Sequence, residues 1–146
     1  MSRWTHVSGA VRLDDLSIVL PVKNTKGTVE KILGPISTFE EWNEDCRLPL
    51  GSEGSIEYVV HENPHEHSIA RFDILFYGDL RNFDSSDLET IDNWFKKLLL
   101  EDFKSEITML SIRDAVLKVE CEPAESYILY YQDNEIKKVE LSNGEE

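Results

Sequence analysis

The sequence is poor in cysteine, glycine and proline. It holds two cysteines, Cys46 and Cys121, together with seven glycines and five prolines among 146 residues. Two cysteines so far apart do not make a disulfide scaffold, so we expect both thiols to be reduced. Because 40% of the residues are hydrophobic, the composition indicates a folded chain rather than a disordered one. We expect a single domain over residues 1–141 and a frayed tail over residues 142–146.

Long hydrophobic runs are also missing. The sequence has no stretch of about 18 apolar residues and no charged-then-apolar leader, so we expect neither a membrane span nor a signal peptide. The resulting expectation is a soluble, cytoplasmic protein. The sequence also lacks a nucleophile elbow and an H-E-x-x-H motif, and residues 51–54 have neither the lysine nor the length of a phosphate-binding loop. We therefore predict that the protein is not an enzyme.

Acidic residues, in contrast, are abundant and unevenly distributed. The chain has 29 acidic and 15 basic residues, which gives a formal net charge of −14. Residues 40–92 alone carry fourteen of the acids and three bases, Arg47, Arg71 and Arg81. Such a field repels nucleic acid and attracts a basic surface that normally binds it. Two interpretations stay open: a solvated face that promotes solubility, or carboxylates that imitate the phosphates of a duplex.

Capping signals and helical periodicity predict two acidic helix starts. The main helix is expected over residues 86–99, where a capping box of Ser86 and Glu89 opens an apolar stripe. The stripe consists of Leu88, Ile91, Phe95, Leu98 and Leu99. A further capping box, formed by Thr38 and Glu41, predicts a short acidic helix that ends near Cys46. Residues 28–33 also fit a short helix, which Gly34-Pro35 would end.

Period-two alternation predicts the strands. They are expected over residues 4–13, 55–60, 69–77, 112–121, 127–132 and 136–141. The second and third strands form a hairpin, and Asp133-Asn134 turns the C-terminal hairpin. Gly9 allows another backbone to approach the first strand closely. The order of the elements predicts an α+β fold: a ferredoxin-like antiparallel sheet with one main helix, a short acidic helix and a C-terminal hairpin.

Three of the four histidines fall in one predicted loop. His61, His65 and His67 lie close together in the chain, and the hairpin neck is expected to bring His61 and His67 together, with Cys46 or Glu66 nearby. Imidazole and thiolate groups are ligands that Zn²⁺ prefers, so the three histidines and Cys46 are candidate zinc ligands with a structural role. Their spacing matches no standard zinc signature. The alternative, a solvated polar turn whose histidines gain charge as the pH falls, stays open.

Trp42 stands among four carboxylates, which is an unusual place for an indole on a protein surface. It is either an anchor at an interface or a residue that packs the short helix onto the sheet, since it would share a helix face with Phe39. With Trp42 as the anchor, we predict a partner-binding set built on the surrounding acids and on the histidine loop. The set is Glu40, Glu41, Trp42, Glu44, Asp45, Glu62 and Glu66.

Three short segments carry a resemblance to known proteins. Residues 2–9 (SRWTHVSG), 50–55 (LGSEGS) with 61–64 (HENP), and 77–81 (YGDLR) resemble small acidic proteins carried by phages of Gram-positive bacteria. Within that group the chain is similar to phage anti-CRISPR proteins that block a type II effector nuclease of the Cas9 kind. The resemblance spans most of residues 2–121. It implies a non-enzymatic inhibitor in the cytoplasm of the bacterial host, which binds protein and holds a metal in some cases.

The resemblance and the charge lead to one main functional hypothesis and two alternatives. The main hypothesis is nucleic-acid mimicry: an acidic face binds a basic surface of a host DNA-targeting defence protein and obstructs nucleic-acid loading. The first alternative is a protein that sequesters a cyclic nucleotide signal, which requires a pocket where Arg71 or Arg81 converges with aromatic rings. The second is a metal-dependent hydrolase built on the histidine loop.

Overall fold

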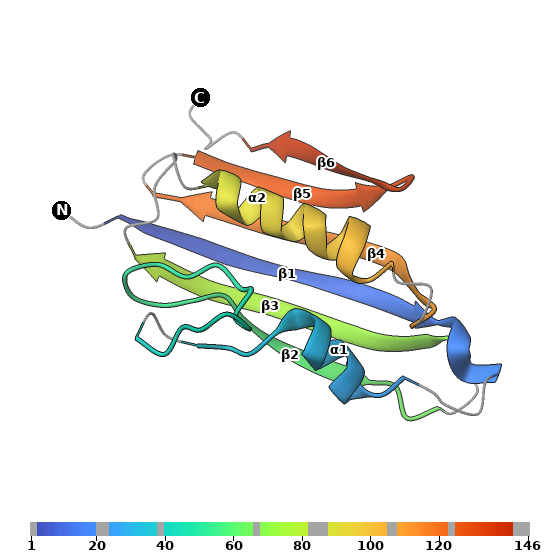
Figure 1. Ribbon diagram of the computed structural model, residues 1–146. Coiled ribbons are helices and arrows are strands. Elements are labelled where there is room, and N and C mark those ends of the chain that lie inside the picture. Colours follow the sequence, from blue (N-terminus) through green and yellow to red (C-terminus); the bar gives the residue numbers. More distant parts are fainter. Residues whose placement is uncertain are drawn as a thin grey trace.

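The computed structural model describes residues 3–19, 24–37, 40–65, 68–81, 88–104, 108–122 and 125–141. Six strands lie in these ranges (Figure 1): β1 (Trp4–Asp15), β2 (Glu57–Glu62), β3 (Ala70–Arg81), β4 (Leu110–Cys121), β5 (Glu125–Gln132) and β6 (Glu135–Glu140). The helices in the same ranges are α1 (Lys26–Leu33), α2 (Leu88–Lys97), a 3₁₀ turn η1 (Leu16–Val19) and a π turn η2 (Leu98–Asp102) that extends α2.

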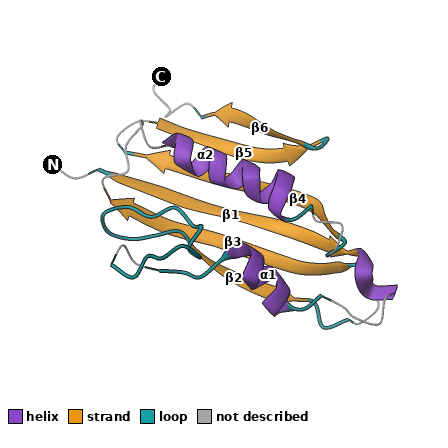
Figure 2. Ribbon diagram, viewed as in Figure 1, coloured by secondary structure: helices purple, strands orange, loops and turns teal. Residues whose placement is uncertain are grey.

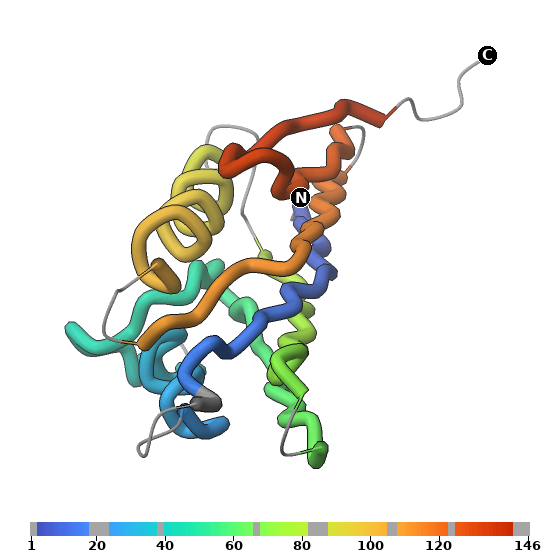
Figure 3. The backbone as a smooth tube through the Cα atoms, turned by 90° about the vertical axis from the view of Figure 1, so that its right-hand side faces the viewer, coloured from blue at the N-terminus to red at the C-terminus, as the bar shows by residue number. Residues whose placement is uncertain are grey.

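All six strands join one antiparallel sheet in the order β2-β3-β1-β4-β5-β6. The connection through α1 runs from β1 to β2 with β3 between them, and the connection through α2 runs from β3 to β4 with β1 between them. The second connection starts from a strand that runs opposite to the first, and it crosses the sheet in the opposite direction. Two right-handed crossovers related in this way place their helices on the same side of the sheet. Figures 2 and 3 show α1 and α2 on one face of the sheet. The predicted α+β class is confirmed.

The core lies between the sheet and the two helices. From β1, whose alternation was predicted, Thr5, Val7, Val11 and Leu13 are all buried. The predicted apolar stripe of α2 is buried in full, and Trp94 packs edge-on against Phe76 of β3 with a ring separation of 5.3 Å. Burial of this stripe supplies the stability of α2, because the apolar face of an amphipathic helix gains more from packing than from helix propensity.

The C-terminal hairpin turns where the sequence predicts. Asp133 and Asn134 link β5 to β6 with φ angles of 53° and 64°. Positive φ at both central residues defines a type I′ turn, whose twist matches that of the strands it joins, and asparagine and aspartate tolerate this conformation. Gly9 is also confirmed as a point of close approach, because a Cβ atom there would lie 2.3 Å from the carbonyl oxygen of Val116.

The predicted acidic helix is wrong over its described part, since residues 40–46 form turns. Asn43 explains the difference. Its side-chain Oδ1 accepts a hydrogen bond from the Asp45 amide at 2.8 Å, and its backbone amide lies 3.4 Å from Cys46 Sγ, which accepts the bond. These local bonds compete with the helical hydrogen-bond pattern. Thr38 and Ser86, on which the two predicted capping boxes depend, lie outside the described residues.

Candidate protein-binding surface

The acidic segment, defined here as residues 40–45, belongs to the loop between α1 and β2. This loop lies on the helix-bearing side of the sheet (Figure 1). α1 ends at Gly34, whose φ angle of 84° is accessible to glycine at little cost. Arg47 then donates hydrogen bonds to the carbonyl oxygens of Ile32 at 2.8 Å and Lys31 at 3.3 Å. The guanidinium group therefore satisfies helix-end carbonyls and fixes the loop to α1.

Every residue of the acidic segment is exposed, and Cys46 and Leu48, which follow it, are buried. The indole of Trp42 is 54% exposed, so it does not pack a helix onto the sheet, and the interface interpretation is the one that its position favours. Phe39, with which it was expected to share a face, lies outside the described residues. Four carboxylates and one half-exposed indole thus stand on a loop with an anchored C-terminal end.

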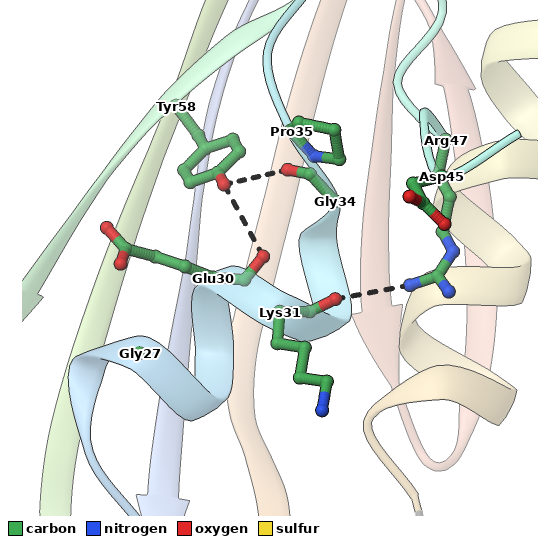
Figure 4. A pocket seen from close by; sticks show the side chains of 8 residues that line it. All are labelled: Gly27, Glu30, Lys31, Gly34, Pro35, Asp45, Arg47 and Tyr58. Atoms are coloured by element: carbon green, nitrogen blue, oxygen red, sulfur yellow. Dashed lines mark hydrogen bonds between the residues drawn. The ribbon is translucent and has the colours of Figure 1, made fainter. Parts of the chain in front are cut away.

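A depression of about 600 Å³ opens beside the acidic segment (Figure 4). Asp45 belongs both to the acidic segment and to the lining of this depression. Tyr58 closes one wall and donates a hydrogen bond to the carbonyl oxygen of Gly34 at 2.8 Å, and its burial, with a smaller effect of Glu30, raises the pKa of its hydroxyl. Figure 4 shows the side chain of Lys31 pointing away from Tyr58. The full lining is Gly27, Glu30, Lys31, Gly34, Pro35, Asp45, Arg47 and Tyr58.

Part of the hydrogen-bonding capacity of this depression is used within the protein. Tyr58 and Arg47, two of its hydrogen-bond donors, are both engaged with carbonyl groups of the α1 end. What it offers is the rim carboxylate of Asp45, next to the acidic segment.

Glu62, a predicted member of the partner-binding set, has a different position. Its carboxylate accepts a hydrogen bond from the backbone amide of Lys26 at 3.0 Å, at the first turn of α1, and pairs with Arg71 at 2.9 Å. A carboxylate is favourable there because the N-terminal end of a helix is electropositive. Glu62 therefore lies at the opposite end of α1 from the acidic segment and does not extend it. Glu66 lies outside the described residues.

The candidate zinc ligands are separated in the part of the chain that the structure describes. Cys46 is buried in the loop beyond α1, whereas His61 projects from the helix-free face of β2, where its Nδ1 lies 3.9 Å from Asp73 Oδ2. His65 is exposed in the loop that follows, and His67 lies outside the described residues. Among the described residues, no group of three or more histidine, cysteine, aspartate or glutamate side chains is arranged to hold a metal. Zinc binding stays a prediction for elemental analysis.

The two arginines required for nucleotide binding do not converge. Arg71 and Arg81 lie at opposite ends of β3, ten residues apart in an extended strand. Each pairs with a carboxylate at 2.9 Å, Arg71 with Glu62 and Arg81 with Glu53. The cyclic nucleotide alternative therefore gains no support from the positions of these two side chains.

Comparisons with known proteins include a weak structural similarity. No family model matches the chain, and no curated protein matches it. Among solved structures, the chain is similar to a chain of the Csm3-Csm4 subcomplex of the type III-A CRISPR-Cas interference complex. The sequences are 14% identical, the alignment covers 97% of this chain and 91% of the other, and the TM-score is 0.36. No helix in the described ranges is long and apolar enough to cross a membrane.

Sequence reasoning missed a charged cluster around His6. The imidazole of His6 lies between two carboxylates, with Nδ1 2.6 Å from Asp79 and Nε2 2.9 Å from Glu122. The hydrogen bond to Asp79, and then that to Glu122, raises the pKa of His6. These partners are 73 and 116 residues away in the chain, so only the register of β1 between β3 and β4 reveals them.

Proposed function

We propose that this protein is a non-enzymatic inhibitor that binds a basic surface of another macromolecule through the acidic segment. The observation that supports this function is the run of six consecutive exposed residues at 40–45, with four carboxylates and the half-exposed indole of Trp42. The charge of the whole chain, −14, favours the approach of a basic partner and disfavours nucleic acid.

The loop geometry suits such a role. Closely spaced carboxylates present negative charge as a phosphate backbone does, so they fit a channel lined with lysine and arginine. The bonds of Arg47 to the end of α1 hold the loop before binding, which lowers the conformational entropy that an interface must overcome. Trp42 then supplies the apolar anchor, since tryptophan is enriched among the residues that dominate binding energy.

In its finer form the proposal names the partner class. We infer a phage-borne inhibitor that binds a DNA-targeting host defence protein, a Cas9-like effector, in the bacterial cytoplasm and obstructs its loading with nucleic acid. The charge of the acidic segment and the sequence resemblance support this partner class. For the fold we propose a ferredoxin-like unit, formed by β2-β3-β1-β4 with α1 and α2, to which the β5-β6 hairpin is added.

Reversal of the acidic segment tests the proposal. Replacing Glu40, Glu41, Glu44 and Asp45 together with lysine should weaken binding to the effector about 30-fold or more, because each lost surface charge pair contributes about 0.5–1 kcal/mol. The binding constant and the inhibition of DNA cleavage by the purified effector are the measurements. Trp42→Ala, which leaves the charge unchanged, should also weaken both.

A matched control separates the segment from the total charge. Glu89, Glu101, Glu125 and Glu140 are also exposed, and reversing all four changes the net charge by the same amount. We expect this control to retain inhibition, with circular dichroism showing that both variants fold. Equal inhibition by the acidic-segment variant and the wild type would remove the proposal. Equal loss in both variants would mean that net charge, and not this loop, produces binding.

A further inference from the structure

The face of the sheet that carries no helix is unusually apolar for this acidic chain. Figure 3 shows both helices on one side of the sheet, with the other side bare. Nine large hydrophobic side chains are exposed among the described residues, and five of them belong to this face. They are Val59 (50% exposed), Leu75 (55%), Tyr77 (45%), Val116 (42%) and Val139 (46%). More than half of the exposed apolar side chains are therefore gathered on one surface.

The strand register aligns these residues. Val59 of β2 is opposite Leu75 of β3, which is opposite Ala10 of β1; Ala10 is opposite Val116 of β4, which is opposite Tyr130 of β5. This apolar row crosses five neighbouring strands without a charged residue. Side chains directly opposite one another on a sheet face lie about 5 Å apart, so the row is a continuous apolar strip.

The charges beside the apolar row are balanced, unlike those of the whole chain. On one side lie Asp73, Arg12 and Asp114, which alternate in sign across three strands, with His61 next to Asp73. Arg12 forms two hydrogen bonds from Nε to the Asp114 carboxylate, at 2.9 and 3.1 Å, and this pair lowers the pKa of Asp114. On the other side Glu57 and Lys118 flank Tyr77 and Ser8. These two flanking rows together hold three acidic and two basic residues, in a molecule of net charge −14.

We propose that this helix-free face binds a second copy of the chain, so that two sheets pack face to face in a two-fold symmetric dimer. In such a dimer a surface meets itself and must be self-complementary. The apolar row satisfies this condition, because a two-fold axis along it places the row against its own copy. Stacked sheets pack about 10 Å apart, with side chains of this size filling the space between them.

Charge complementarity supports a second copy as the occupant. The same two-fold axis places the two flanking rows opposite each other. Lys118 then faces Asp114 of the partner subunit, which joins opposite signs. Glu57 faces His61 of the partner subunit, whose ring N–H is a hydrogen-bond donor for a carboxylate. A nucleic acid would instead meet a chain with 29 acidic and 15 basic residues.

The size of the face is also sufficient. With strands about 4.8 Å apart and a rise of about 3.3 Å per residue, six strands of this length cover roughly 25 Å by 30 Å, or about 750 Å². A stable specific interface buries about 800 Å² per partner. The acidic segment lies on the opposite, helix-bearing side, so the dimer leaves both copies of it exposed (Figure 1).

Sedimentation velocity of the full chain tests the dimer. Between about 10 and 500 µM protein, we expect the mass to rise from 16.9 kDa toward twice that value. Association should strengthen as sodium chloride rises from about 50 to 500 mM, because salt screens the repulsion between two chains of like charge. Binding through the acidic segment has the opposite salt dependence, so the two interactions are distinguishable.

Variants locate the contact. Val116→Lys places a charge in the middle of the apolar row and should raise the dissociation constant about tenfold or more. Ile36→Lys, at a residue 44% exposed outside the sheet, makes the same charge change and should leave the constant unaltered. Leu75→Gln weakens the row without any charge and serves as the second variant if Val116→Lys does not fold. A wild-type chain that stays monomeric throughout, or a dimer that Val116→Lys and Leu75→Gln both leave intact, overturns the proposal.

Discussion

The hydrogen bond between Tyr127 and Asp92 gives a quantitative prediction for the packing of α2 on the sheet. Tyr127 is 3% exposed, and its hydroxyl donates to Asp92 Oδ1 at 2.6 Å. Burial, followed by the bond to Asp92, strongly raises the pKa of this hydroxyl, so it stays protonated over the usual range of pH. Lys138 Nζ contacts the other carboxylate oxygen at 3.0 Å and lies 4.1 Å from the centre of the Tyr127 ring.

Tyr127→Phe removes the hydroxyl alone. The ring, its core contacts and its contact with Lys138 remain, and Asp92 keeps one charged partner. The loss is therefore that of one hydrogen bond to an ionised acceptor, about 1.5–3 kcal/mol of unfolding free energy. For a chain of 146 residues, a loss of about 2 kcal/mol lowers Tm by about 4–8 °C.

Urea unfolding followed by far-UV circular dichroism provides the assay. Tyr130→Phe is the matched control, because Tyr130 is on the same strand but on the helix-free face, and we expect a change below about 0.5 kcal/mol. A double-mutant cycle of Tyr127→Phe with Asp92→Asn isolates the pair and should give a coupling of about 1 kcal/mol or more. A coupling of zero, with Tyr127→Phe as stable as the wild type, would refute this account of how α2 is held.

Two further predictions concern β1. Because the pKa of His6 is raised in the folded state, its contribution to stability is complete below the unfolded pKa and is lost as the pH rises through the folded pKa. His6→Gln should therefore flatten the fall in unfolding free energy from about pH 6 to 8, and an unchanged slope would contradict this. Gly9→Ala should lower the unfolding free energy by about 1–3 kcal/mol, since the new methyl carbon would lie 2.3 Å from the Val116 carbonyl oxygen. Gly27→Ala within α1, where the same atom meets nothing nearer than 3.5 Å, should be neutral or stabilising in the same urea titration.

Local sequence patterns were sufficient to predict the helices and strands that are stabilised mainly by burial of their apolar side chains. The stripe of α2 and the alternation of β1 and β3 follow periods that appear in a single stretch of sequence, and the structure buries those residues. The acidic helix was wrong for an equally local reason. Its capping pattern fits a helix start, but Asn43 bonds to its own neighbours, and the segment has no buried face to outweigh them.

Properties that depend on register were beyond the reach of sequence reasoning. The position of β1 between β3 and β4 brings His6 to Asp79 and Glu122 and aligns Ala10 with Leu75 and Val116. Each residue alone is an ordinary outward strand position. For the candidate binding surface, charge and an isolated tryptophan indicated a segment that the structure leaves exposed, and its role in binding stays a prediction. Glu62 was grouped with this segment, although its carboxylate binds the far end of α1.

The place of β1 in the middle of the sheet has a consequence for how the molecule assembles. β1 has both its neighbouring strands far along the chain: Val7 pairs with Gly78 on one side and with Val119 on the other. Its inward-facing valines and leucine therefore stay without their native cover until most of the polypeptide has emerged. Such long-range pairing slows folding to milliseconds or longer and leaves apolar strands open to aggregation meanwhile. Repulsion among acidic nascent chains lessens that hazard, so the same anions that we assign to partner binding also protect the protein during synthesis.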